Sequence, residues 1–314
     1  MIEIYNESCF DTMQKMQPKS IDIVLTSPFY NTNKKAGKRG TLENTVVKQG
    51  QYNYVRYDTH VDNMTNEEYC DFTVRLFDDF DRILKNDGCV LYNICYGAEN
   101  TIGMFQAITS IIDKTNFTIA DVIVWKKPTA FPNSCSPNRL TRIWEFVFVL
   151  CRKDELKTFK CNKQVTSVRK TGQKAYENIY NFIDAKNNDE TCPYNKATFS
   201  SELCIKLLNI YAVGENVTVY DPFIGSGTVA VACQELGFNC YGSEISEKQV
   251  EWARDRLKRN TQKELFAQAL ENKVERVIID TVKIEHKWDF VDLEKQIMVQ
   301  GGGISKASDE ALAK

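Results

Sequence analysis

The sequence is poor in the residues and patterns that mark several common protein classes. Its 314 residues include only two histidines, His60 and His286, and its eleven cysteines form no Cys-x-x-Cys pair. Structural zinc sites need closely spaced cysteine and histidine ligands, so we predict no metal site. No apolar run approaches the roughly 20 residues of a membrane helix, and no signal peptide is recognisable. We therefore expect a cytoplasmic protein that has no membrane partner and keeps its scattered cysteines reduced.

A strong net charge is also missing, because the formal charge is only −2. The basic residues nevertheless form four groups, two of them just after strand-like runs, which fits a cleft lined for phosphate groups. Ordinary solvated surface gives similar groups, so charge alone does not decide between the two. The candidate phosphate contacts are Lys34, Lys35, Lys38, Arg39, Lys126, Lys127, Arg139, Arg142, Lys163, Arg169 and Lys170.

Short apolar runs alternate with segments of helical periodicity along most of the chain. This alternation is typical of α/β proteins with a mostly parallel sheet. Thr65 to Glu68 resembles a capping box, and Asn86-Asp87-Gly88 is expected to end the helix that it opens. Residues 31–60 are expected to form a long loop. The predicted strands are 2–5, 21–25, 89–94, 119–125, 144–151, 217–220 and 239–243, and the other predicted helices are 11–16, 102–115, 200–211, 229–233 and 246–259.

One motif, Asp221-Pro222-Phe223-Ile224-Gly225-Ser226-Gly227-Thr228, joins a predicted strand to a helix. Its two glycines allow a left-handed backbone and close approach to a ligand. Glu244 follows the next strand, where an acidic side chain can bind the hydroxyl pair of a ribose. A dinucleotide fingerprint would have a third glycine where Ala230 stands. An aspartate at the strand tip instead suits a cofactor with a cationic amino-acid end, such as S-adenosylmethionine.

A second motif, Thr26-Ser27-Pro28-Phe29-Tyr30, lies near the start of the chain and also follows an apolar run. The Ser27 hydroxyl and the Pro28 carbonyl can each accept an N–H hydrogen bond from an exocyclic amine. Such bonds pull the nitrogen toward tetrahedral geometry and free its lone pair for attack on a methyl group. Phe29 or Tyr30 offers a face on which a base can stack. A base in a duplex must first be flipped out to reach such a pocket.

The two motifs and their order resemble those of the β group of DNA amino-methyltransferases. In that family a catalytic S/D/N-P-P-Y/F motif precedes the cofactor motif D-P-F-x-G-S-G-T, which residues 221–228 match in full. Phe29 replaces the second proline of the catalytic motif, which bears on the rigidity of that turn. The segment 195–203 resembles the family's H-P-A-T-F-P-E-E-L stretch without its histidine and prolines, and Glu7 holds the place of an acidic residue that approaches the cofactor adenine.

The resemblance implies a Rossmann-like α/β methyltransferase sheet with an inserted target-recognition region. It divides the chain into a catalytic part (1–151), the insertion (152–190), a cofactor-binding part (191–262) and a C-terminal extension with a flexible tail (263–314). The implied cofactor is S-adenosylmethionine. The implied catalytic residues are Ser27, Pro28, Phe29 and Tyr30. The implied cofactor-binding residues are Glu7, Thr198, Phe199, Asp221, Phe223, Gly225, Ser226, Gly227, Thr228 and Glu244.

The resemblance also implies double-stranded DNA as the substrate and allows a cognate restriction endonuclease as a partner, with the chain a monomer or a homodimer. Serine at the first catalytic position mostly accompanies methylation of cytosine N4 in this family, so we favour cytosine over adenine N6. Amide methyltransferases carry the cofactor motif first, which opposes that alternative. A dehydrogenase would need the missing third glycine. A non-catalytic DNA-binding protein with the same fold is the remaining alternative, and cofactor binding would distinguish it.

Overall fold

A computed structural model describes residues 1–31, 64–97, 100–130, 132–133, 137–190, 192–195 and 198–262. Residues 1–258 form one compact unit. Four candidate DNA contacts (Lys34, Lys35, Lys38 and Arg39), most of the predicted 31–60 loop and the C-terminal extension lie outside the described residues. None of the described helices is long and apolar enough to cross a membrane.

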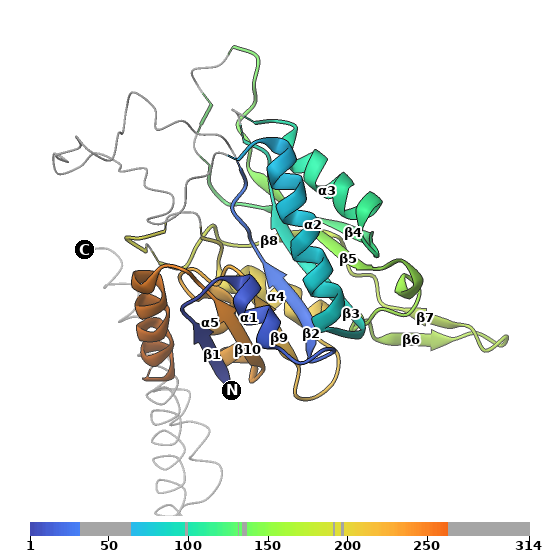
Figure 1. The fold of residues 1–314 in the computed structure, drawn as a ribbon. Coiled ribbons are helices and arrows are strands. Elements are labelled where there is room, and N and C mark those ends of the chain that lie inside the picture. Colours follow the sequence, from blue (N-terminus) through green and yellow to red (C-terminus); the bar gives the residue numbers. More distant parts are fainter. Residues whose placement is uncertain are drawn as a thin grey trace, which may run out of the picture. The chain divides into compact units, whose positions relative to one another are not determined.

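An eight-stranded sheet forms the centre of the unit (Figure 1). Along the sheet the strands follow the order β1-β10-β9-β2-β3-β5-β4-β8, and only β5 runs against its neighbours. The mostly parallel α/β fold expected from the sequence is confirmed. The strands are β1 (Ile2–Tyr5), β2 (Ile21–Thr26), β3 (Leu84–Ile94), β4 (Phe117–Lys126), β5 (Trp144–Arg152), β8 (Phe182–Asp184), β9 (Thr218–Asp221) and β10 (Asn239–Ser243).

Helices cover both faces of the sheet, and each face has its own apolar core. Successive side chains of a strand point to opposite faces, so Val24 joins the core under α1 to α3, whereas Ile23 and Leu25 join the core under α4 and α5. A further helix begins at residue 247 and packs Val250 and Ala253 into the second core. The other helices are α1 (Cys9–Lys15), α2 (Asn66–Ile83), α3 (Gly103–Lys114), α4 (Ser201–Tyr211) and α5 (Thr228–Leu236).

The start of α2 agrees with the sequence prediction, whereas its end does not. Its start carries the expected capping box, in which Thr65 and Glu68 bond to each other's backbone N–H groups. Its end was predicted wrongly, because Asn86-Asp87-Gly88 lies inside β3, which begins directly after the helix. The guanidinium of Arg152 donates to the carbonyls of Asp81 and Leu84. The backbone N–H groups of Lys19 and Ser20 donate to the next two carbonyls, those of Arg82 and Ile83. Distant segments thus satisfy the end of the helix, and no glycine cap is needed.

The predicted insertion 152–190 contains a short 3₁₀ turn, η1 (Lys153–Glu155), and a hairpin of β6 (Val165–Val168) and β7 (Lys174–Tyr176). It leaves the sheet at the amino end of β3, where Lys160 donates its N–H to the carbonyl of Asp87. The hairpin projects from the side of the unit (Figure 1). The insertion then returns to the main sheet, because β8 pairs in parallel with β4.

The topology brings the two sequence motifs together. β2 and β9 are far apart in the chain but adjacent in the sheet, with Ile23 opposite Val219 and Val24 opposite Tyr220. Because both strands run in the same direction, the motifs that follow them emerge at the same carboxyl edge. Ligands of open α/β sheets bind at this edge.

Candidate active site

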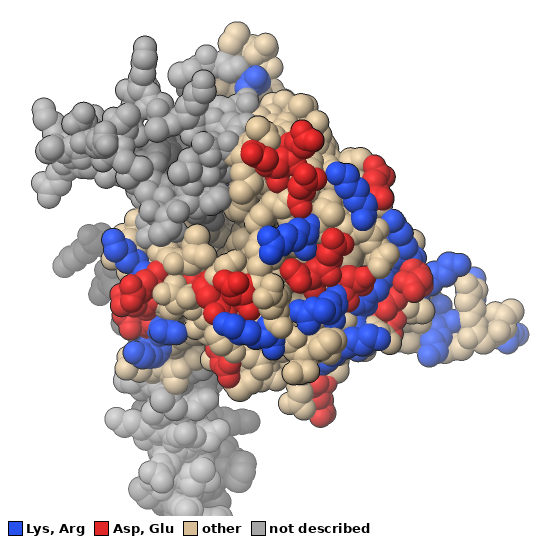
Figure 2. Space-filling view, in the orientation of Figure 1, with Lys and Arg blue, Asp and Glu red and all other residues tan. Residues whose placement is uncertain are grey.

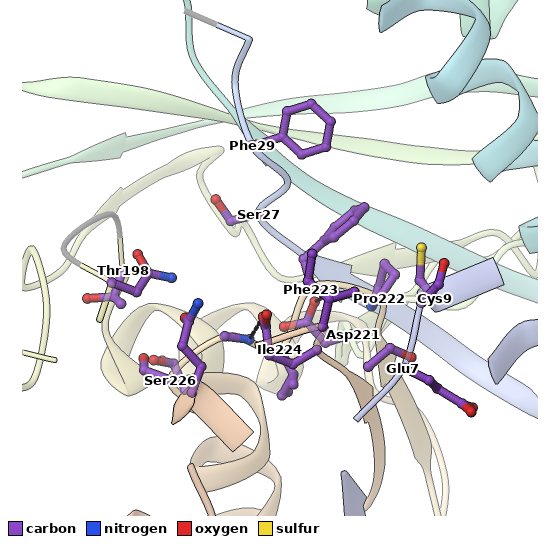
Figure 3. A pocket seen from close by; sticks show the side chains of 18 of the residues that line it. Glu7, Cys9, Ser27, Phe29, Thr198, Asp221, Pro222, Phe223, Ile224 and Ser226 are labelled. Atoms are coloured by element: carbon purple, nitrogen blue, oxygen red, sulfur yellow. Dashed lines mark hydrogen bonds between the residues drawn. The ribbon is translucent and has the colours of Figure 1, made fainter. Parts of the chain in front are cut away.

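A cavity of about 290 Å³ lies at the carboxyl edge of the central strands and takes its walls from both motifs. Figure 3 shows Ser27 and Phe29 approaching it from the turn after β2, Asp221 from the end of β9 and Phe223 from the turn that follows. The structure therefore places the following predicted residues in one cavity: Glu7, Ser27, Phe29, Thr198, Phe199, Asp221, Phe223, Gly225, Ser226, Thr228 and Glu244. Pro28, Tyr30 and Gly227 belong to the same two turns but are not among the residues that line the cavity.

Asp221 is the most deeply buried acid of the cavity, with an exposed fraction of 2%. Its Oδ1 atom accepts hydrogen bonds from Thr26 Oγ1 at 2.7 Å and from the Phe223 N–H at 3.0 Å. Burial raises the pKa of Asp221 to about 7, against the opposing effect of these two donors. A buried carboxyl of this kind is ready to pair with a positively charged ligand group.

The glycine turn is held by Glu244, from the loop after β10. One carboxylate oxygen accepts the N–H of Gly225 at 3.2 Å, and the other accepts the N–H of Ser246 at 2.8 Å. Gly225 and Gly227 both have positive φ angles, 50° and 83°, as the sequence predicted. A Cβ atom on Gly225 would lie 3.1 Å from the amide nitrogen of Asn195. Glycine is therefore required at position 225 for two reasons, the positive φ angle and the lack of space for a Cβ atom.

Glu7 also lines the cavity, beside Cys9 (Figure 3). Its carboxylate accepts the Thr12 hydroxyl at 2.9 Å and pairs with the ammonium of Lys15. The hydrogen bond from Lys15 lowers the pKa of Glu7 below its ordinary value, so the Glu7 carboxylate stays ionised at neutral pH.

Several lining residues were not predicted from the sequence, and three of them carry side chains of clear interest: Asn195, Ile245 and Gln249. Ile245 follows Glu244 and is 54% exposed, so a large apolar side chain after the acidic residue was an available signal. Asn195 stands where the related motif has histidine, so its position in that motif was a signal too. Gln249 lies in the first turn of an ordinary polar helix, and only the packing of that helix brings it to the cavity.

Phe29, which replaces the second proline of the catalytic motif, is anchored by packing. The centre of its ring lies 5.4 Å from the ring centre of Tyr69, 5.2 Å from that of Phe72 and 6.2 Å from that of Phe223. Its carbonyl accepts the buried Tyr69 hydroxyl at 2.7 Å. These contacts fix a turn that a proline would otherwise stiffen, and they connect the catalytic turn to the cofactor motif through Phe223.

A polar network lies behind Ser27. The Tyr30 hydroxyl is 3.1 Å from Ser27 Oγ, 3.0 Å from Asn93 Oδ1 and 2.8 Å from Glu145 Oε2. Glu145 in turn pairs with the ammonium of Lys127. Burial and the neighbouring Glu145 charge hold the pKa of Tyr30 well above its ordinary value, so the phenol stays protonated.

The described candidate DNA contacts fall into two groups. Lys126, Lys127, Arg139 and Arg142 come from the end of β4 and the segment before β5, at the carboxyl edge. Lys127 is only 22% exposed at its side chain and points inward to Glu145, whereas Lys126 pairs with Asp184 at 3.1 Å. Arg142 stacks on Tyr96, 4.6 Å from the ring centre.

The second group, Lys163, Arg169 and Lys170, belongs to the β6–β7 hairpin and its approach. Figure 2 shows Lys and Arg predominating on this projection, whereas acidic and basic side chains are mixed over α2. The structure therefore does not bring the two basic groups into one cluster.

Comparison with known families places this site in a protein class. The family described as DNA methylase, covering N6 and N4 amino-methyltransferases, matches residues 21–255. This span contains both motifs and most of the cavity, and the chain belongs to this DNA methylase family.

Individual relatives are more distant. The chain is 27% identical over 162 residues to the Type II methyltransferase M.SmaI of Serratia marcescens, covering 51% of this chain and 53% of the relative. It is 23% identical to M.HinfI of Haemophilus influenzae, covering 81% and 68% of the two chains. The chain thus spans about half the length of M.SmaI.

Two solved structures show that the fold is shared. PvuII DNA methyltransferase (cytosine-N4-specific) aligns with a TM-score of 0.59 at 16% identity, covering 83% of this chain and 90% of that one. The M1.HpyAVI-SAM complex aligns with a TM-score of 0.51 at 19% identity, covering 82% and 99%.

Proposed function

We propose that the chain is an S-adenosylmethionine-dependent DNA methyltransferase that modifies the N4 amine of cytosine in double-stranded DNA. The observation that carries the proposal is the single cavity shared by Ser27 and Asp221. Their motifs supply what the two reactants need, and the fold puts them next to each other. Membership of the DNA methylase family supports the same reaction.

The residues of the cavity fit the cofactor. The Asp221 carboxylate suits the ammonium of the methionine end, and Glu244 and the ionised Glu7 suit hydroxyl and amino groups of the adenosine. Phe223 and Ile245 offer apolar surface for the adenine. When bound, S-adenosylmethionine supplies an electrophilic methyl group, which the target nitrogen takes while sulfur keeps the electron pair and one amine proton leaves to water.

The turn after β2 serves the amine. Ser27 Oγ and the Pro28 carbonyl are the acceptors that hold the two amine hydrogens, so the nitrogen lone pair can point into the cavity. Phe29 and Tyr30 are held by packing and hydrogen bonds, which keeps both acceptors in place before the base arrives. This preorganised turn lowers the barrier to a reaction that a planar amine undergoes slowly.

The serine in this position supports cytosine as the target base, through the resemblance described above. The relatives are named Type II methyltransferases, which supports a place in restriction-modification beside a cognate restriction endonuclease. The flipped base would enter from the carboxyl edge, where Arg139 and Arg142 lie.

Mass spectrometry of nucleosides from DNA incubated with the chain and S-adenosylmethionine tests this proposal. We expect N4-methylcytosine, and we expect Ser27→Ala to lower its formation at least a hundredfold while cofactor affinity stays near that of the wild type. N6-methyladenine alone would move the target to adenine. Cofactor binding by calorimetry without any methylated nucleoside would favour the non-catalytic alternative.

A further inference from the structure

The network behind Ser27 draws its side chains from separate segments of the central sheet. Tyr30 lies in the turn after β2, Asn93 on β3 and Glu145 at the start of β5. Asn93 is 1% exposed, and the Glu145 side chain is 17% exposed. A polar cluster so shielded from water must satisfy its hydrogen bonds internally, which allows its hydrogens to be assigned one by one.

The Asn93 amide is oriented by its own donor. Its Nδ2 group donates to the Phe146 carbonyl at 2.9 Å, which turns Oδ1 toward Tyr30. Both Asn93 Oδ1 and the Glu145 carboxylate can only accept hydrogen bonds from the phenol. Tyr30 has a single hydroxyl hydrogen, so that hydrogen goes to one of these two acceptors. The carboxylate is the stronger acceptor and, at 2.8 Å, the closer one.

This assignment leaves Tyr30 no hydrogen for Ser27. The 3.1 Å contact between the two hydroxyls is therefore a bond in which Ser27 donates to Tyr30. A serine hydroxyl has one hydrogen and two lone pairs. With its hydrogen directed away from the cavity, Ser27 keeps both lone pairs available, and an amine that must donate N–H needs such an acceptor.

The charge of Glu145 decides this direction. A protonated carboxyl would donate to Tyr30, which could then donate to Ser27, and the serine hydrogen would be free to point at the amine. Lys127 opposes this reversal, because its ammonium pairs with the other carboxylate oxygen of Glu145, Oε1, and leaves Oε2 to accept from Tyr30. The Cys95 thiol beside Glu145 adds no second negative charge to this cluster, because burial raises its pKa to about 11 and keeps it neutral.

We propose that Glu145 is a positioning residue that acts through Tyr30 to hold Ser27 as a hydrogen-bond acceptor for the target amine. The inference rests on the proposed function, because it assigns a task to the amine-binding serine. It adds two residues, Glu145 and Lys127, that no motif indicated. Lys127, predicted as a phosphate contact, is thereby assigned to the interior of the site.

Glu145→Gln is the informative variant because it keeps the shape of the side chain. Lys127 attracts the amide oxygen of the new glutamine, so the amide nitrogen faces Tyr30 and donates to it. The chain of hydrogen bonds then runs toward Ser27. We expect single-turnover methyl transfer to slow about tenfold or more, with S-adenosylmethionine and DNA dissociation constants within about twofold of the wild type.

A double-mutant cycle separates this effect from simple damage. If Glu145 acts through Tyr30, then Glu145→Gln has little further effect on the rate in a Tyr30→Phe background. Asp22→Asn is the matched control, because Asp22 is a similarly shielded carboxylate (14% exposed) paired with Lys85 from a neighbouring strand. It should leave the rate unchanged. A wild-type rate in Glu145→Gln, or rate losses that multiply independently, would overturn the inference.

Neutron diffraction from deuterium-exchanged crystals of the free protein tests the same inference without any catalysis. We expect the Ser27 deuterium to point at Tyr30 Oη and the Tyr30 deuterium at Glu145. A deuterium on Tyr30 directed at Ser27 would refute the assignment even if the chain methylates cytosine. The expected deuterium positions in a chain that methylates no DNA would instead count against the proposed function alone.

Discussion

Thr26 donates a 2.7 Å hydrogen bond to the carboxylate of Asp221, although 195 residues separate them in the chain. Each is the last residue of its strand, and both side chains are almost fully buried. The bond thus joins the motif that contains Ser27, the proposed amine acceptor, to the motif proposed to bind the cofactor. It also means that the ionisation of Asp221 and the position of the catalytic turn depend on each other.

Thr26→Val removes this bond with little change in shape. A hydrogen bond to a charged group contributes about 1.5–3 kcal/mol, so the Asp221 carboxylate should become harder to ionise. We expect S-adenosylmethionine affinity at neutral pH to fall by about tenfold in calorimetry. Thr26→Ser is the control, because it keeps the hydroxyl and should bind nearly as the wild type. Equal affinities in both variants would show that the bond does not assist cofactor binding.

The raised pKa of Asp221 makes cofactor binding depend on pH. A cationic ligand group favours the carboxylate, so binding releases a proton from a carboxyl whose pKa is about 7. Affinity should therefore rise as the pH increases from about 5.5 to 7.5, by at most tenfold per pH unit. Asp221→Asn should bind weakly at every pH in this range. A wild-type affinity independent of pH would contradict the assignment of Asp221.

The raised pKa of Asp221 also affects the stability of the cofactor-free protein, which should fall as the pH increases, whereas cofactor affinity should rise. The folded pKa of Asp221 lies above its ordinary value of 3.8, so this carboxyl stabilises the free protein most at low pH. That contribution is lost as the pH rises through about 7. Asp221→Asn should therefore have a higher Tm than the wild type at pH values above this pKa, even though it no longer binds cofactor. Scanning calorimetry of both proteins checks this.

Gly225→Ala tests the glycine turn. The new Cβ would lie 3.1 Å from Asn195 Nδ2 and 3.4 Å from Gln249 Oε1, on a backbone with φ near 50°. Both neighbours line the cavity, so we expect cofactor affinity to fall at least tenfold. Gly237→Ala is the matched control, because Gly237 also has a positive φ but open space around it. It should cost about 1 kcal/mol of stability and leave affinity unchanged.

The sequence predicted the fold well because its local signals agree with the tertiary structure. Apolar runs became strands, and the capping box at Thr65 opened α2. The end of that helix could not be predicted, because its last carbonyls are satisfied by distant parts of the chain, among them Arg152 from a strand much later in the sequence. A distant side chain had taken the role that local turn residues normally play.

The candidate site divides in the same way. Residues within the two motifs were predictable because ligand chemistry dictates their types, and the structure gathers most of them in one cavity. Gln249 and Glu145 were not predictable, since each lies in an element with no chemical signature. Their positions follow from how a helix and an antiparallel strand pack beside the motifs. Lys127 shows the converse case, because a lysine predicted from a basic cluster as a DNA contact pairs with an acid in the structure.

The two basic groups give a last prediction about DNA. Arg139 and Arg142 lie at the carboxyl edge with Ser27, whereas Lys163, Arg169 and Lys170 leave from the amino end of β3. A duplex that delivers a base to the cavity must lie against the carboxyl edge, so we expect Arg139→Gln with Arg142→Gln to weaken DNA binding more than neutralising the hairpin.

Salt titrations distinguish the two surfaces. Removing one side chain that binds a phosphate lowers the slope of log affinity against log salt by about 0.9. We expect the arginine pair to reduce the slope by up to about 2, and the triple glutamine variant of the hairpin to change it little. A larger reduction in the hairpin variant would instead support the target-recognition role that the family resemblance implies for residues 152–190. DNA would then have to contact the protein well beyond the cavity, and the hairpin would have to reach it by bending from the side of the sheet.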